Sequence, residues 1–142
     1  MNGNAELLNF IYQNSQMGVE TMEQLGEMTR DETFQSFLEK QKEGYLNFHK
    51  QAKEMLCQRG CDEKGLGTFE KLRTYLMINM QTMVDKSTSH MAEMLIQGST
   101  MGINDAIKKL KEYPDADPKV GKLMGDLQKF EEKSLEKLKG FL

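Results

Sequence analysis

Apolar residues recur at three- and four-residue spacings along most of the 142-residue chain, which predicts a series of amphipathic α-helices. The first helix is expected over residues 4–28, with Asn4 as a candidate N-cap. The second is expected over residues 31–59, where Thr29 and Glu32 have the spacing of a capping box. Because so few residues separate the two helices, we expect them to be antiparallel neighbours.

Two more long helices are predicted in the second half of the chain. Residues 89–112 and 118–142 each carry one apolar stripe. Between them Asp117 is a candidate N-cap and Pro118 occupies the first helical position, where its missing N–H removes no hydrogen bond. These two helices should form a second antiparallel hairpin.

A shorter helix is predicted between the hairpins, over residues 68–85, with Thr68 as its cap. The polar cluster at residues 86–89 favours a break there. The alternative is one helix that continues to Gln97 and breaks at residues 98–100. The connector is long enough to run back along most of a bundle. The pattern therefore predicts one all-α domain over residues 1–142, an up-down four-helix bundle of two antiparallel hairpins joined by a long, partly helical crossover.

Composition excludes several classes of protein. The net charge is −3 and the signs are interspersed, which argues against a nucleic-acid partner. No apolar run approaches the roughly 18 residues of a membrane span, and the first residues lack the features of a signal peptide. We therefore expect a cytoplasmic protein. In that setting Cys57 and Cys61 are predicted to be thiols rather than a disulfide or part of a zinc site.

The layout and several stretches of sequence resemble the ferritin-like superfamily, and within it an uncharacterised bacterial family. The stretches are YQNSQMGVETMEQL at residues 12–25, MAEMLIQGSTMGINDAIKKLKEYPDAD at residues 91–117 and FEEKSLEKLKGFL at residues 130–142. The resemblance covers nearly the whole chain and implies a ferritin-like fold. It implies no activity, because a fold alone does not determine chemistry.

Metal-binding members of that superfamily place a carboxylate on each of two helices and a Glu-x-x-His pair on each of the other two. In this chain only Glu131 falls within an apolar stripe, and Ser134 stands where the histidine would follow. The acids of the first two helices lie off the stripes: Glu20, Glu23, Glu39 and Glu43. The di-iron ligand set is therefore expected to be incomplete.

A polar layer is predicted at mid-height of the bundle core. Its members are Ser15, Gln41, Tyr45, Ser99 and Glu131. One interpretation is that the layer fixes the register of the helices. The other is that it holds a small ligand or a single ion, with Glu131 and His49 as candidate metal ligands. Glycines at positions 18, 98 and 102 destabilise helix interiors. A close approach between helices is expected to offset their cost, and a cavity is the alternative.

The sequence contains no nucleophile motif and no phosphate-binding loop, so we expect a protein that is not an enzyme and has no cofactor. The first hypothesis is a ferritin-like bundle protein of assembly or stress-associated function. The second is a protein that holds iron or another ion near Glu131. The third is a Cu(I) buffer, based on thioethers at helical spacing: Met77, Met80, Met83, Met91 and Met94.

A homodimer is also predicted, because several apolar residues lie beside the stripes and widen the apolar surface. These residues are Phe37, Met77, Ile78 and Val84. Phe141 and Leu142 are expected either to close the end of the bundle or to contact another subunit.

Overall fold

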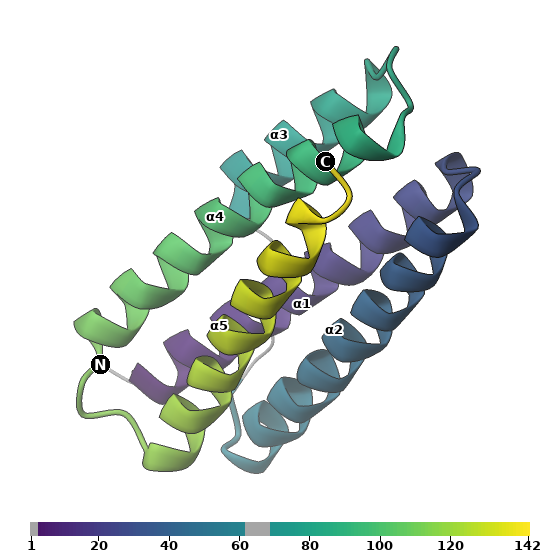
Figure 1. The fold of residues 1–142 in the computed structure, drawn as a ribbon. Coiled ribbons are helices and arrows are strands. Elements are labelled where there is room, and N and C mark those ends of the chain that lie inside the picture. The colour runs from purple at the N-terminus through teal and green to yellow at the C-terminus, as the bar shows by residue number, and fades with distance from the viewer. Residues whose placement is uncertain (1–2, 62–68) are drawn as a thin grey trace.

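The computed structural model describes residues 3–61 and 69–142, and these residues form five α-helices and no strand (Figure 1). The helices are α1 (Gly3–Met28), α2 (Glu32–Gln58), α3 (Glu70–Gln81), α4 (Thr88–Glu112) and α5 (Pro118–Lys139). The predicted all-α class is confirmed. The predicted cap Thr68 lies outside the described residues.

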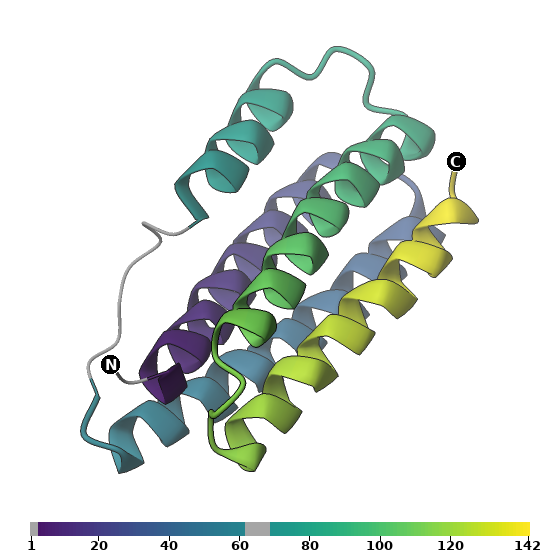
Figure 2. The ribbon, with the colours of Figure 1, turned by 90° about the vertical axis from the view of Figure 1, so that its left-hand side faces the viewer.

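The four long helices form a bundle from two antiparallel pairs, α1 with α2 and α4 with α5 (Figures 1 and 2). Helix α1 is central because it also contacts α4 and α5, and α2 contacts α5. The short helix α3 lies outside this group, where it packs on α4 and α1. The bundle interior is therefore closed on one side by a helix of only 12 residues.

Helix α2 begins differently from the prediction. Its N-cap is Asp31, whose Oδ1 accepts hydrogen bonds from the backbone N–H groups of Thr33 (3.0 Å) and Phe34 (3.1 Å). The predicted cap Thr29 instead accepts from the N–H of Asp31 at 3.2 Å. The carboxylate is the stronger acceptor, so it takes the capping position. Its other oxygen accepts from the hydroxyl of Thr88 at 2.8 Å, which ties the start of α4 to the start of α2.

The break before α4 is confirmed. Helix α3 ends at Gln81, and the Oγ of Ser87 caps α4 by accepting from the N–H of His90 at 3.2 Å. The alternative break at residues 98–100 is wrong, because these residues lie inside α4. The side chain of Ser87 satisfies an N–H that the start of the helix would otherwise leave without a partner.

The opposite end of the bundle is joined by Asn4 and Asp117. Asn4 was expected to cap α1, but its Oδ1 accepts from the backbone N–H of Asp117 at 2.7 Å. Asp117 caps α5, as predicted, by accepting from the N–H of Lys119 at 2.9 Å. Its other oxygen accepts from Arg59 at 2.7 Å. One aspartate therefore connects the starts of α1 and α5 with the end of α2.

The buried face of α5 departs from the predicted stripe near its end. The residues that it buries are Val120, Leu123, Met124, Leu127, Glu131, Ser134 and Leu138. Leu135 is half-buried, and Leu142 is 60% exposed. Phe141 folds back onto Phe34, with ring centroids 5.1 Å apart, and onto Phe37 at 5.4 Å. Phe37 is therefore buried, which corrects its assignment to an exposed apolar surface.

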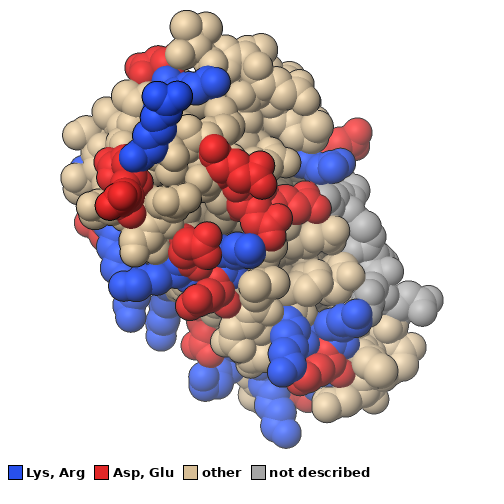
Figure 3. Space-filling model, turned by 90° about the vertical axis from the view of Figure 1, so that its right-hand side faces the viewer, with Lys and Arg blue, Asp and Glu red and all other residues tan. Residues whose placement is uncertain are grey.

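The outer surface carries both signs of charge, and on the face drawn in Figure 3 acidic and basic side chains alternate without forming a region of one sign. Among the described residues, no helix is both long and apolar enough to cross a membrane. At the end of α2, Cys57 is exposed, whereas Cys61 packs against the core.

Two glycines allow aromatic rings to reach the centre of the bundle. A Cβ at Gly18 would stand 2.6 Å from the ring of Tyr45, so no larger residue fits without displacing that ring. Gly44 is covered in the same way by the ring of Phe130. Tyr45 and Phe130 in turn pack edge to face, with centroids 5.1 Å apart. The predicted close approach is confirmed at Gly18.

We therefore expect Gly18→Ala to lower the free energy of unfolding by about 1–3 kcal/mol, the usual range for an overpacked core. The control is Gly125→Ala on α5, where an added Cβ meets no atom within 4 Å. That variant should gain up to about 1 kcal/mol from its better helix propensity. Urea denaturation measures both values, and a Gly18→Ala protein stabilised as much as the control would contradict the account.

Candidate functional site

The candidate site is built around Glu131, the one charged side chain that is buried among the described residues. Only 3% of its surface is exposed. The residue takes a core position because it follows Leu127 by four residues and precedes Leu138 by seven, so all three lie on one face of α5. A carboxyl group at such a position is costly unless it is hydrogen-bonded or protonated.

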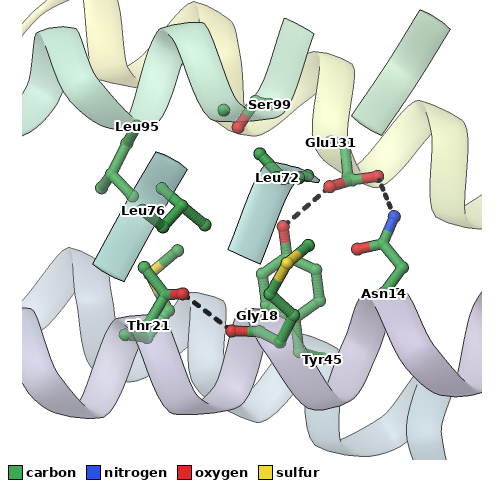
Figure 4. Close-up of a pocket in the computed structure, with 12 residues that line it drawn as sticks. Asn14, Gly18, Thr21, Tyr45, Leu72, Leu76, Leu95, Ser99 and Glu131 are labelled. Atoms are coloured by element: carbon green, nitrogen blue, oxygen red, sulfur yellow. Dashed lines mark hydrogen bonds between the residues drawn. The ribbon is translucent and has the colours of Figure 1, made fainter. Parts of the chain in front are cut away.

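Two neutral side chains donate to this carboxyl group (Figure 4). The Nδ2 of Asn14 on α1 lies 3.0 Å from Oε1, and the hydroxyl of Tyr45 on α2 lies 3.0 Å from Oε2. Each oxygen therefore accepts one hydrogen bond from a different helix. Among the described residues, no lysine, arginine or histidine forms an ion pair with Glu131. We refer to Asn14, Tyr45 and Glu131 as the carboxyl triad.

Burial has the largest effect on the pKa of Glu131. It raises the pKa of Glu131 from its ordinary value of 4.5 to about 7, although the hydrogen bonds from Asn14 and Tyr45 act in the opposite direction. Burial and the charge of Glu131 also raise the pKa of Tyr45 well above its ordinary value. Tyr45 therefore remains a neutral donor, and Glu131 is the member of the triad that changes charge near neutral pH.

The predicted polar layer is divided between three places. Tyr45 joins Glu131, whereas the Oε1 of Gln41 lies within hydrogen-bonding distance of the hydroxyl of Ser134, one turn further along α5. Ser15 donates to the carbonyl of Ile11 in its own helix at 2.6 Å. Gln41 thus accepts from Ser134 and Ser15 donates within its own helix, so neither of these hydrogen bonds involves Glu131.

His49 also stands apart from Glu131. Its ring stacks on Tyr12 with centroids 4.3 Å apart, and its Nδ1 lies 3.3 Å from the carbonyl of Tyr12 and 3.4 Å from the hydroxyl of Ser15. The Nδ1 of His49 thus contacts Tyr12 and Ser15. Within residues 3–61 and 69–142, no three histidine, cysteine or acidic side chains gather as a metal site would require.

The remaining acids of the first hairpin face outward. Glu23, Glu39 and Glu43 are exposed, and Glu20 is half-exposed. Glu23 pairs with Lys42 across the surface at 3.0 Å. The structure therefore gives Glu131 no carboxylate partner from α1 or α2.

A small cavity of ≈ 30 Å³ lies beside the carboxyl triad, and all five described helices contribute to its walls. Helix α3 supplies Leu72 and Leu76, and α4 supplies Gly98 and Ser99 (Figure 4). Ser99, a predicted member of the polar layer, thus lines the cavity beside Glu131. This volume is enough for about two water molecules.

Asn14 was missed by the sequence analysis, which chose Ser15 instead. Helix α1 contacts every other described helix, so it buries residues beyond a single stripe. The missed signal is a second stripe of buried residues on α1, which recur at alternating four- and three-residue spacings: Leu7, Ile11, Asn14, Gly18, Thr21 and Leu25. Asn14 lies in this stripe because the stripe faces α5 and α4.

The chain was compared with protein families, curated proteins and solved structures, and no family model, curated protein or solved structure matches it. The site must therefore be interpreted from its own geometry.

The raised pKa of Glu131 makes stability depend on pH. Because the folded protein binds this proton more tightly than the unfolded chain, the group's stabilising effect is complete below about pH 4.5 and is lost as pH rises through about 7. We expect the free energy of unfolding to fall by up to about 3 kcal/mol across this window. Asp31, Asp85 and Asp117 have lowered pKa values and act at lower pH.

Urea denaturation across this window tests the expectation, with Glu131→Gln as the variant that cannot ionise. Its stability should change little with pH, and above about pH 7 it should exceed that of the parent protein. Tyr45→Phe removes a hydrogen bond that lowers the pKa of Glu131, so the stability of this variant should keep falling to a higher pH than that of the parent protein. Identical slopes for the parent and Glu131→Gln would show that Glu131 is not the responsible group.

Proposed function

We propose that this protein is a non-enzymatic, cytoplasmic, ferritin-like bundle protein without a di-iron centre, of assembly or stress-associated function. Two features support the ferritin-like assignment. The helices form two antiparallel pairs, and the chain passes between the pairs through a segment that contains α3. The sequence also resembles that superfamily over residues 12–25, 91–117 and 130–142.

The single observation that carries the proposal is the neutral surrounding of Glu131. A pair of divalent cations needs about four carboxylates to balance its charge, together with nitrogen ligands. Here one carboxyl group receives hydrogen bonds from an amide and a phenol, and its α5 neighbour one turn on is Ser134 rather than histidine. The interior is therefore better suited to a single carboxyl group that binds a proton, Glu131 with a pKa of about 7, than to a pair of metal ions.

Two alternatives from the sequence analysis make different predictions. Iron or another ion near Glu131 would draw on Glu131 alone among the candidate ligands, because His49 is held by Tyr12 and Ser15. Cu(I) would need thioether sulfurs. Of the methionines in question, Met77 is exposed, whereas the others are buried in the apolar core: Met80, Met83, Met91 and Met94.

Metal analysis of protein purified without chelators tests the proposal. We expect far less than one equivalent of iron, manganese or copper per chain, and the same result for Glu131→Gln. The matched control is Glu43→Gln, which removes an exposed acid from α2. Two iron ions per chain that disappear in Glu131→Gln but not in Glu43→Gln would overturn the proposal, and retained copper would favour the methionine alternative.

We also propose that the protein is a homodimer. On α3, Ile78 is 54% exposed and Met77 is 38% exposed, and Val84 in the segment after α3 is 95% exposed, so this part of the chain exposes three apolar side chains. Light scattering should give twice the mass of the chain, and Ile78→Lys should give the mass of one chain. Leu46→Lys on α2, where the leucine is 46% exposed, is the control and should remain dimeric. A monomeric parent protein at micromolar concentration would contradict this assignment.

A further inference from the structure

We propose that the cavity beside the carboxyl triad is a binding site for a short alkylammonium ion, with the ammonium group on Glu131 and the alkyl group against α3 and α4. This inference rests on the proposed absence of a resident metal at Glu131. It goes further because it assigns a ligand class to the cavity.

The polar end of the cavity has the properties of a cation site. Glu131 is 3% exposed and lines the cavity, and its two oxygens accept only from Asn14 and Tyr45 among the described residues. A carboxylate oxygen can accept more than one hydrogen bond, so both retain capacity for a further donor. Because no described cation pairs with Glu131, the ionised form lacks the partner that a buried charge normally has.

Groups around Glu131 on the other helices are neutral. Helix α1 presents Asn14, α2 presents Tyr45, α3 presents Leu72 and α4 presents Ser99 and Gly102. A ligand's ammonium group would therefore meet one negative charge and no competing positive charge. The ring of Tyr45 also lines the cavity, and aromatic faces attract cations.

The other end of the cavity is apolar. Leu72 and Leu76 come from α3, and Leu95 comes from α4 (Figure 4). A bare metal ion would find no oxygen or nitrogen ligand on these three side chains. A short alkyl group would instead contact them through dispersion and lose its contact with water.

The size of the cavity limits the ligand and its affinity. A volume of ≈ 30 Å³ admits about two water-sized groups, which matches the two non-hydrogen atoms of methylammonium. A ligand of two non-hydrogen atoms reaches at best a dissociation constant on the order of 5 mM. We therefore expect saturable binding in the millimolar range.

Gly98 provides a variant that changes the cavity while keeping the carboxyl triad. A Cβ there would stand 3.3 Å from the Cδ2 of Leu76 and 3.8 Å from the Cδ1 of Leu72, so the methyl group would take up cavity space and displace only the end of a leucine. Alanine is also the better helix former, so Gly98→Ala should fold. Gly125→Ala is the matched control, because it makes the same change away from the cavity.

Methylammonium chloride is titrated into chelator-treated protein at about pH 8, where Glu131 is mostly ionised, and the backbone amide signals of Ser99 and Gly102 are followed by NMR. Saturable shifts are expected in the parent and in Gly125→Ala, with at least tenfold weaker binding in Gly98→Ala and Glu131→Gln. Binding by the parent should also weaken at about pH 5, where Glu131 is protonated. Tetramethylammonium is too large for the cavity and should give no saturation.

Three results would overturn the proposal. The first is no saturation by methylammonium at about 100 mM, well above the expected dissociation constant. The second is equal binding in Gly98→Ala or equal binding of tetramethylammonium. The third is equal saturation by potassium chloride, which would make this an inorganic cation site. The metal content of the same preparation, before chelation, tests the proposed function separately, so the two failures can be distinguished.

Discussion

The burial of one carboxyl group constrains the centre of this bundle. Glu131 reaches the core from α5, where no described cation pairs with it, and it is stabilised by one donor from α1 and one from α2. Replacing either donor would leave the carboxyl group with an unsatisfied oxygen in an apolar setting. The two hydrogen bonds therefore connect the hairpins, because Asn14 and Tyr45 belong to the first pair of helices and Glu131 to the second.

Small residues make this arrangement possible. Gly18 leaves the space that the Tyr45 ring fills, which carries the phenol oxygen to the carboxyl group. Gly102 on α4 is less constrained, because a Cβ there would meet Glu131 at ordinary van der Waals distances, 3.6 Å from Oε2 and 3.7 Å from Oε1. Helix propensity is thus given up at Gly18 in favour of the polar contacts of the triad. Gly18 and Gly98 also line the cavity beside the triad.

Much of this architecture could be predicted from the sequence, since helical periodicity and cap residues are local signals. The bounds of the four long helices, the break before α4 and the inward position of Glu131 follow from them, whereas α3 ends at Gln81 rather than at residue 85. The partners of Glu131 depend on the rotation of each helix about its axis, which only tertiary packing sets. Asn14 was missed for this reason, and Gln41 and Ser15, predicted to share a polar layer with Glu131, form hydrogen bonds elsewhere.

The central claim is that Glu131 is a buried carboxyl group that changes charge near neutral pH. The most direct measurement is a pH titration of the side-chain carboxyl carbons by NMR, in protein labelled with ¹³C at glutamate and assigned through Glu131→Gln. The account predicts that the Glu131 resonance has a midpoint near pH 7. A Glu131 midpoint near the ordinary pKa value of 4.5 would contradict it.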